Sequence, residues 1–159
     1  MRTFIALDIP DEVKDKITEI QNELQIEGKL TKKENIHLTL KFLGDVHNVD
    51  DIKKQLRNIN HEQFTATIDE IGTFSNRIIW LHLNNVDELQ KKIDNILPFP
   101  KENRFMSHIT IARPKKIIKI PNINKITFQI KSFSLQKSIL TSEGPIYETL
   151  ERFPLQLKK

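Results

Sequence analysis

The chain has 159 residues, of which 38% are hydrophobic and 29% are charged, values that fit one globular domain with its own core. It contains no cysteine, which excludes disulfides, thiol nucleophiles and thiolate metal ligands. The formal net charge is +4, and the opening apolar run, Phe4 to Leu7, is too short for a signal peptide or a membrane span, so a cytoplasmic protein is expected.

In the first two thirds of the chain, the predicted elements mix strands with helices. Strands are predicted where β-branched and aromatic residues dominate, at Arg2 to Asp8, Ile36 to Leu43, Phe64 to Phe74 and Arg77 to Leu83. Helices are predicted where apolar residues recur every three or four positions, at Val13 to Leu24, Ile52 to Ile59 and Val86 to Leu97. Asp50 is predicted to cap the second helix, and Asn85 with Glu88 to form a capping pair on the third.

Beyond Pro98 and Pro100, which break the helical pattern, the predicted structure is almost entirely strand. The predicted strands are Met106 to Ala112, Ile126 to Phe133, Leu135 to Thr141 and Ile146 to Phe153. The sequence contains no low-complexity segment, and no interdomain linker is expected. The combination of βαβ units with hairpins predicts a single α+β domain with antiparallel sheets over residues 1–159.

Positive charge is concentrated in one stretch. No acidic residue lies between Asn103 and Ser142. The stretch holds eight basic residues: Arg104, Arg113, Lys115, Lys116, Lys119, Lys125, Lys131 and Lys137. A local positive field attracts polyanions, which makes nucleic acid a candidate partner, with an ordinary solvated basic surface as the alternative.

One short pattern, His-aliphatic-Thr-aliphatic, occurs twice. The copies are His37-Leu38-Thr39-Leu40 and His108-Ile109-Thr110-Ile111, and the two histidines lie 71 positions apart, close to half the chain. Because side chains alternate faces along a strand, each copy can bury its aliphatic residues and present histidine and threonine together on the other face. Two such strands lining one cleft would bring two imidazoles and two hydroxyls together.

This combination of side chains suits the cleavage of a phosphodiester without a metal. The reaction needs a base for the incoming nucleophile and an acid for the leaving oxygen, and imidazole serves as either near neutral pH. Threonine hydroxyls supply neutral donors to the phosphate oxygens, where charge accumulates. Two alternatives stay open: both motifs are purely structural, or the histidines bind a metal, although no acidic residue lies at ligand spacing to supply the third ligand.

The motifs and their flanks resemble the 2H phosphoesterase superfamily, and within it the RNA 2′,3′-cyclic phosphodiesterases, also called 2′-5′ RNA ligases. The similarity covers nearly the whole chain and is carried by four segments: Arg2 to Leu7, Asn35 to Gly44, Ser107 to Arg113 and Gly144 to Leu150. One departure is Ser107, where many relatives have proline before the second histidine.

The resemblance implies a bilobal, pseudo-two-fold fold, in which two antiparallel sheets flanked by helices face each other across a central cleft. It implies hydrolysis of RNA 2′,3′-cyclic phosphate ends to 2′-phosphomonoesters without cofactor or metal, and reversible 2′-5′ ligation of RNA ends as an additional activity. The expected partners are RNA ends, with tRNA fragments as one source, and the protein is expected to be monomeric and not to bind membranes.

The resemblance also implies that Phe42 and Arg113, each five positions after a histidine, contact the terminal nucleoside. Strict alternation would place Lys41 rather than Phe42 beside His37, so the strand must end or twist for Phe42 to reach the cleft. The position of these two residues tilts the assignment of roles toward His37 as general acid and His108 as general base. A non-catalytic protein that binds RNA ends is the rival interpretation.

Overall fold

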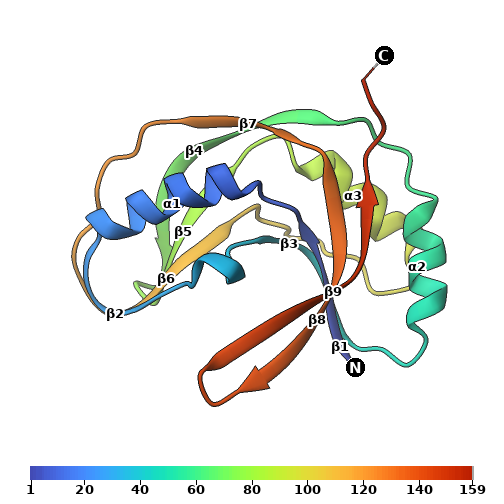
Figure 1. The fold of residues 1–159 in the computed structure, drawn as a ribbon, viewed down its shortest axis with the longest axis horizontal. Coiled ribbons are helices and arrows are strands. Elements are labelled where there is room, and N and C mark those ends of the chain that lie inside the picture. Colours follow the sequence, from blue (N-terminus) through green and yellow to red (C-terminus); the bar gives the residue numbers. More distant parts are fainter. Residues whose placement is uncertain (159) are drawn as a thin grey trace.

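A curled antiparallel sheet, flanked by three helices, forms the framework of residues 1–158, the part of the chain that the computed structural model describes (Figure 1). The strands are β1 (Arg2–Leu7), β2 (Gln25–Leu30), β3 (Leu38–Asp45), β4 (Phe64–Phe74), β5 (Ile78–Leu83), β6 (Ile109–Lys119), β7 (Ile126–Ile130), β8 (Ser132–Thr141) and β9 (Gly144–Pro154). The helices are α1 (Asp11–Glu23), α2 (Val49–Arg57) and α3 (Asp87–Ile96), with a short 3-10 turn η1 (Lys33–Asn35). The predicted α+β class is confirmed.

The sheet has two halves that meet at the histidine motifs. The first half consists of β3, β1, β8 and β9, and the second half consists of β7, β4, β5 and β6. Its strand order is β7-β4-β5-β6-β3-β1-β8-β9, with β2 paired to β6 off this path. The halves join where β3 pairs with β6, through the single register pair Leu38 and Ile109. The two expected sheets are joined into one nine-stranded sheet, whose halves share a narrow junction. Each residue of the joining pair directly follows one of the two motif histidines.

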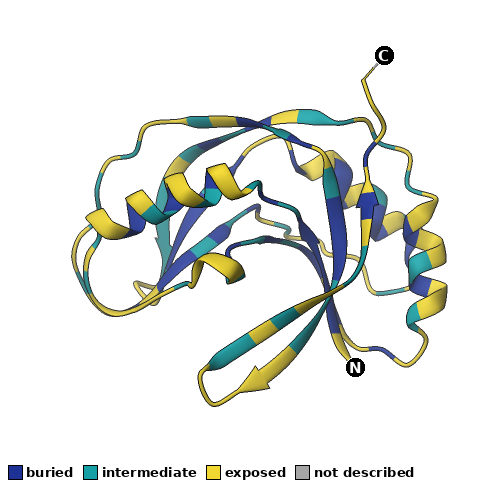
Figure 2. Cartoon of the chain, viewed as in Figure 1, coloured by how far each residue is buried: buried dark blue, intermediate teal, exposed yellow. Residues whose placement is uncertain are grey.

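The helices are exchanged between the two halves. Helix α1 follows β1 in sequence but packs near β6, where the Gln21 side chain reaches the backbone of Ile111. Helix α3 follows β5 but packs against β3, where the Gln90 side chain reaches the backbone of Leu40. Each helix shows a buried stripe facing the sheet and an exposed outer face, as the predicted periodicity requires (Figure 2). One continuous apolar core therefore runs through both halves.

Two local expectations about helix ends are wrong. Helix α2 is capped by Asn48, whose side chain accepts a hydrogen bond from the Asp51 N–H at 3.3 Å, and not by Asp50. No side-chain cap forms at α3, because Asn85 adopts a positive φ of 66° and donates instead to the carbonyl oxygen of Thr65. In both cases the chain path before the helix decides which side chain can fold back onto it.

Strand β2 was not predicted, and β6 extends seven residues beyond the predicted end to pair with it. The sequence of β2 hides it, because all but one of its six residues are exposed and so no alternation of buried side chains marks it. Gly28 lets the two strands approach closely: its φ is +144°, and a Cβ at this position would lie 2.6 Å from the carbonyl oxygen of Arg113. None of the helices in residues 1–158 is long and apolar enough to cross a membrane.

Candidate active site

A cleft lies at the junction of the two halves and collects all six residues singled out from the sequence. Its volume is about 640 Å³, within the range of sites for small ligands. The residues from the two motifs that line it are His37, Thr39, Phe42, His108, Thr110 and Arg113. Both histidines lie one residue before their strands, and not within them as the predicted strand ends implied.

His37 is held by hydrogen bonds at both ring nitrogens. Its Nδ1 lies 2.7 Å from the carbonyl oxygen of Asn35, and its Nε2 lies 3.0 Å from the Thr39 hydroxyl. A carbonyl oxygen can only accept, so Nδ1 carries a proton, and in the neutral ring Nε2 accepts from Thr39. The motif thus supplies an imidazole whose Nε2 has a fixed direction and a hydroxyl donor beside it.

Burial lowers the pKa of His37 from its ordinary value of 6.5, because a charged imidazolium is poorly solvated there. The hydrogen bond to the Asn35 carbonyl opposes this effect, and the nearby charges of Lys14 and His108 reinforce it. The neutral ring therefore predominates in the free protein at neutral pH. A negatively charged ligand in the cleft would counteract burial and favour protonation.

His108 repeats the backbone arrangement of His37. Its Nδ1 lies 2.8 Å from the carbonyl oxygen of Met106, two residues earlier, just as Nδ1 of His37 binds the residue two positions before it. This bond leaves Nε2 as the nitrogen available for proton transfer. The ring packs edge-on against Phe74, with centroids 5.3 Å apart. Ser107, which departs from the family pattern, is buried and donates to the carbonyl oxygen of Leu83 at 2.6 Å.

Each motif ends in a β-bulge, which reverses the alternation of side chains. In β3 the bulged residue is Leu40, since β1 pairs Ile5 with Lys41 and Ala6 with Thr39. In β6 it is Ile111, since β5 pairs Ile79 with Ala112 and Trp80 with Thr110. A bulge places two residues opposite one and so shifts all later side chains to the other face.

The bulges explain why Phe42 and Arg113, and not their neighbours, line the cleft. Lys41, which strict alternation places beside His37, is instead buried, and Phe42 is 76% exposed. At the matching positions of β6, Ala112 is buried and Arg113 is exposed. The expected twist of the strand is therefore a bulge, and it is present in both copies.

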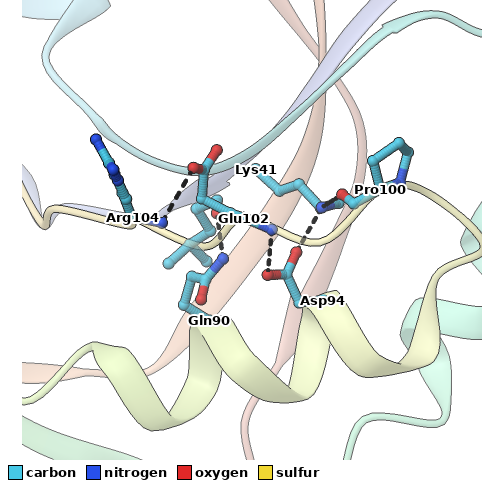
Figure 3. Close-up of polar contacts among 7 residues, drawn as sticks. Lys41, Gln90, Asp94, Pro100, Glu102 and Arg104 are labelled. Atoms are coloured by element: carbon cyan, nitrogen blue, oxygen red, sulfur yellow. Dashed lines mark hydrogen bonds and ion pairs between the residues drawn. The ribbon is translucent and has the colours of Figure 1, made fainter.

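The buried Lys41 ammonium has compensating partners away from the cleft. It forms an ion pair with Asp94 of α3 and donates to the carbonyl oxygen of Pro100 at 2.8 Å (Figure 3). Burial alone would raise the pKa of Asp94, but hydrogen bonds from Lys41, the Glu102 N–H and Gln90 outweigh it and lower that pKa. This cluster fixes the segment that leads to the second motif against the strand that carries the first.

Sequence reasoning assigned no role to Tyr147 or Asn35, yet both belong to the site. The Tyr147 ring, on β9, packs edge-on against His37 and Phe4, with centroids 5.1 and 5.0 Å away. The Asn35 side chain donates to the carbonyl oxygen of Pro145 at 3.1 Å and so ties the β8–β9 hairpin to the residue whose carbonyl orients His37. Both lie within segments that carry the family resemblance, which is the only sequence signal for them.

Positive charge lines the cleft, but most of it does not come from the basic stretch seen in the sequence. Of the eight basic residues in that stretch, Arg113 alone lines the cleft, and the other cleft cations are Arg2, Lys29 and Lys32. Glu143 is the one carboxylate among the lining residues, which leaves an excess of three positive charges. None of the four cations forms an ion pair within residues 1–158. Across that same part of the chain, no group of three or more His, Asp or Glu side chains is arranged to hold a metal ion.

Comparisons with known proteins agree with the fold and the motifs. A family model described as LigT-like phosphoesterase matches residues 7–80. The RNA 2′,3′-cyclic phosphodiesterase of Methanocaldococcus jannaschii is 36% identical over 96% of this chain and 100% of the relative. The chain therefore belongs to the LigT-like phosphoesterase family, the 2H group that its motifs resemble, and it is a hydrolase.

A second sequence relative and two solved structures show the same similarity. The RNA 2′,3′-cyclic phosphodiesterase of Thermotoga maritima is 34% identical over 94% of this chain and 93% of the relative. The crystal structure of Escherichia coli LigT complexed with 3′-AMP has a TM-score of 0.85 at 26% identity and covers 98% of both chains. The complex of the same protein with phosphate has a TM-score of 0.84, also at 26% identity, and covers 98% of this chain and 97% of LigT.

Proposed function

We propose that this protein hydrolyses RNA 2′,3′-cyclic phosphate ends to 2′-phosphomonoesters by acid–base catalysis with its two motif histidines. The observation that carries the proposal is the repeated geometry of His37 and His108. Both rings line one cleft, and both commit Nδ1 to a backbone carbonyl, which leaves Nε2 for proton transfer. The names of the relatives support the cyclic phosphate as substrate.

In the proposed reaction, water attacks phosphorus and the bond from phosphorus to O3′ breaks. The Nε2 atom of His108 takes the proton from water, and the Nε2 atom of His37 gives a proton to O3′. In the protonated ring Nε2 no longer accepts from Thr39, so Thr39, like Thr110, can donate a hydrogen bond to a non-bridging phosphate oxygen. Since burial lowers the pKa of His37, its imidazolium is a stronger acid than free imidazolium, and the charge of the bound phosphate favours its protonation.

A substrate in which sulfur replaces O3′ tests this assignment of roles. A thiolate leaves without an acid, so His37→Ala should recover much of its lost activity on the 3′-thio substrate, while His108→Ala should stay impaired. Rescue of His108→Ala instead would reverse the two roles. Rescue of neither variant would mean that proton transfer to O3′ is not the step that these histidines control.

The charge of the cleft supports an RNA strand over a lone cyclic nucleotide. A cyclic mononucleotide carries one negative charge, whereas the cleft has an excess of three positive charges on unpaired side chains. Phosphates on the 5′ side of the terminal nucleotide would account for the difference. Phe42 and the Arg113 guanidinium offer planar faces on which the terminal base can stack.

Salt dependence tests which cations bind the strand. Removal of Lys29 and Lys32 together should weaken binding of an RNA oligonucleotide and reduce the salt slope by about 0.7 per lost phosphate contact. Removal of Lys125 and Lys131, exposed residues outside the cleft, is the matched control and should leave the slope unchanged. Equal effects of the two double variants would place the RNA elsewhere than along the cleft.

Two further properties belong to the same proposal. A 5′-hydroxyl of RNA in place of water would give a 2′-5′ phosphodiester, which mixing cyclic-phosphate and 5′-hydroxyl fragments, including those of tRNA, would detect. Residues 1–159 are proposed to act as one monomeric domain, and a sedimentation measurement tests the monomer.

A non-catalytic protein that binds RNA ends is the competing candidate. Incubation with a cyclic phosphate in excess EDTA separates the two: product formation at an unchanged rate supports the metal-independent enzyme, and tight binding without product supports the binder. Loss of activity that zinc or manganese restores would show that a metal is required.

A further inference from the structure

Two buried glutamines occupy equivalent places behind the two motifs. Gln21 on α1 is 4% exposed, and Gln90 on α3 is 2% exposed, although glutamine is usually a surface residue. The Nε2 atom of Gln21 donates to the carbonyl oxygen of Ile111 at 2.9 Å, and that of Gln90 donates to the carbonyl oxygen of Leu40 at 3.4 Å. Figure 3 shows Gln90 beside the Lys41–Asp94 pair, under strand β3.

The two acceptors are the bulged residues themselves. Leu40 and Ile111 each lie three positions after their histidine, at the point where the strand register shifts. A bulge leaves its extra residue outside the regular ladder, and a buried carbonyl without a donor is costly. In β6 the Thr31 N–H also donates to Ile111, at 2.9 Å, and Gln21 bridges the Ile111 and Thr31 carbonyls. Both bulges therefore have a buried amide donor directed at the same backbone atom.

We propose that Gln21 and Gln90 are positioning residues that hold the two bulges and thereby keep Arg113 and Phe42 directed into the cleft. Gln21 acts on Arg113, and Gln90 acts on Phe42, each two residues beyond the bulge it holds. The kinetic test of this inference rests on the proposed function, whereas the test by amide hydrogen exchange does not.

The alternative backbone state shows why the position of the bulge matters. Without the bulge, regular alternation would return Lys41 or Ala112 to the cleft face and turn Phe42 or Arg113 toward the core. The histidine and threonine precede the bulge, so their direction would not change. Loss of a glutamine should therefore weaken the binding of the nucleoside while leaving the acid–base pair in place.

Because the helices are exchanged, each glutamine is expected to affect one motif and not the other. Gln21 belongs to the helix of the first half but supports the second motif, and Gln90 does the reverse. A general loss of stability would combine in the same way with a change at Phe42 and with a change at Arg113. A loss of positioning would couple each glutamine only to the residue that it positions.

Double-mutant cycles measure that pattern. Gln90→Met and Gln21→Met keep the side-chain length and remove the donor, and each should lower kcat/KM about 5- to 50-fold, mainly through KM. The matched doubles Gln90→Met with Phe42→Ala, and Gln21→Met with Arg113→Ala, should be far less than multiplicative. The crossed doubles, Gln90→Met with Arg113→Ala and Gln21→Met with Phe42→Ala, should be multiplicative. Equal behaviour of matched and crossed pairs would overturn the proposal.

Two further measurements separate this proposal from stability and from the proposed function. Leu89→Val, a buried neighbour of Gln90 on α3, loses packing without losing the hydrogen bond and should leave KM unchanged. Amide hydrogen exchange of residues 40–42 should accelerate in Gln90→Met, and that of residues 111–113 in Gln21→Met, whether or not any substrate is turned over. Unchanged exchange at both bulges would overturn the proposal. Absent turnover by the unmodified protein, with accelerated exchange in the variants, would contradict the proposed function alone.

Discussion

The two halves of the site share a backbone and differ in what surrounds it. Both histidines bind the carbonyl two residues earlier through Nδ1, and both motifs end in a bulge backed by a buried glutamine. The first half adds Thr39 on the imidazole of His37, an aromatic wall and a buried ion pair behind the strand. In the second half, Phe74 packs against the His108 imidazole, and alanine stands where the first half has Lys41.

In this site, the backbone sets the orientation of each imidazole, and the surrounding side chains set its environment. The repeated backbone contact gives both imidazoles the same tautomer, with the proton on Nδ1. Burial of the His37 ring lowers its pKa, so the surroundings act on an imidazole whose backbone contact is the same in both motifs.

The largest effect is expected from removing either imidazole. His37→Ala and His108→Ala should each reduce cyclic phosphodiesterase activity by about 10²- to 10⁴-fold, because each removes one partner of the acid–base pair. Initial rates measure the effect, with circular dichroism to verify folding and exposed His47→Ala as the matched control. Turnover near that of the unmodified protein in either single variant would refute the two-histidine mechanism.

A loss of stability is expected from breaking the buried ion pair between β3 and α3, behind the first motif. Lys41→Met leaves the Asp94 carboxylate buried without its cation and should lower the free energy of unfolding by about 3–5 kcal/mol. Urea denaturation measures this, and the double variant with Asp94→Asn should recover much of the loss, because no uncompensated charge remains. An unchanged unfolding midpoint in Lys41→Met would mean that the pair contributes nothing.

A smaller effect is expected from the aromatic wall of the first half. Tyr147→Leu removes the ring that packs on His37 and should lower kcat/KM by about 2- to 12-fold, the equivalent of about 0.5–1.5 kcal/mol for one aromatic contact. Tyr147→Phe keeps the ring and serves as the control for packing. If the phenylalanine variant loses as much as the leucine variant, the hydroxyl and not the ring carries the role.

The smallest effect is expected in the dependence of stability on pH. The pKa of His37 is lower in the folded protein than in the unfolded chain, so the unfolded state binds more protons below about pH 6.5. Stability is therefore retained above this pH and lost as the pH falls toward the folded pKa. His37→Gln should flatten this part of the profile of unfolding free energy, and His108→Gln is the comparison across the halves. An unchanged profile in His37→Gln would contradict the lowered pKa.

The sequence was sufficient to predict most strands, all three helices and the meeting of the two motifs in one cleft. These features depend on local periodicity and on a repeated pattern of residue types. The burial of Lys41 was not predictable, since its partner Asp94 lies 53 positions away and alternation points the side chain the other way. The bulge at Leu40 leaves no local signal either, because the alternation of polar and apolar residues continues unbroken from Thr39 to Phe42.

The strand β2 and the cation set of the cleft were missed for a related reason. Lys29 and Lys32 reach the cleft through the pairing of β2 with β6, a contact between segments far apart in sequence. The net charge of a stretch says nothing about which of its side chains share a face after folding. Arg113 was identified because it belongs to a motif, and the remaining cleft cations have no motif.

Because the two halves of the sheet join at one residue pair, other parts of the chain can vary in length without moving that pair. Leu38 and Ile109 directly follow His37 and His108, so a single rung of backbone pairing separates the two imidazoles. Insertions or deletions in the outer loops, or in the projecting β8–β9 hairpin (Figure 1), change the outline of the cleft without changing that rung. The spacing of the two imidazoles is thus insulated from changes elsewhere, and the outline of the cleft can diverge while that spacing stays constant.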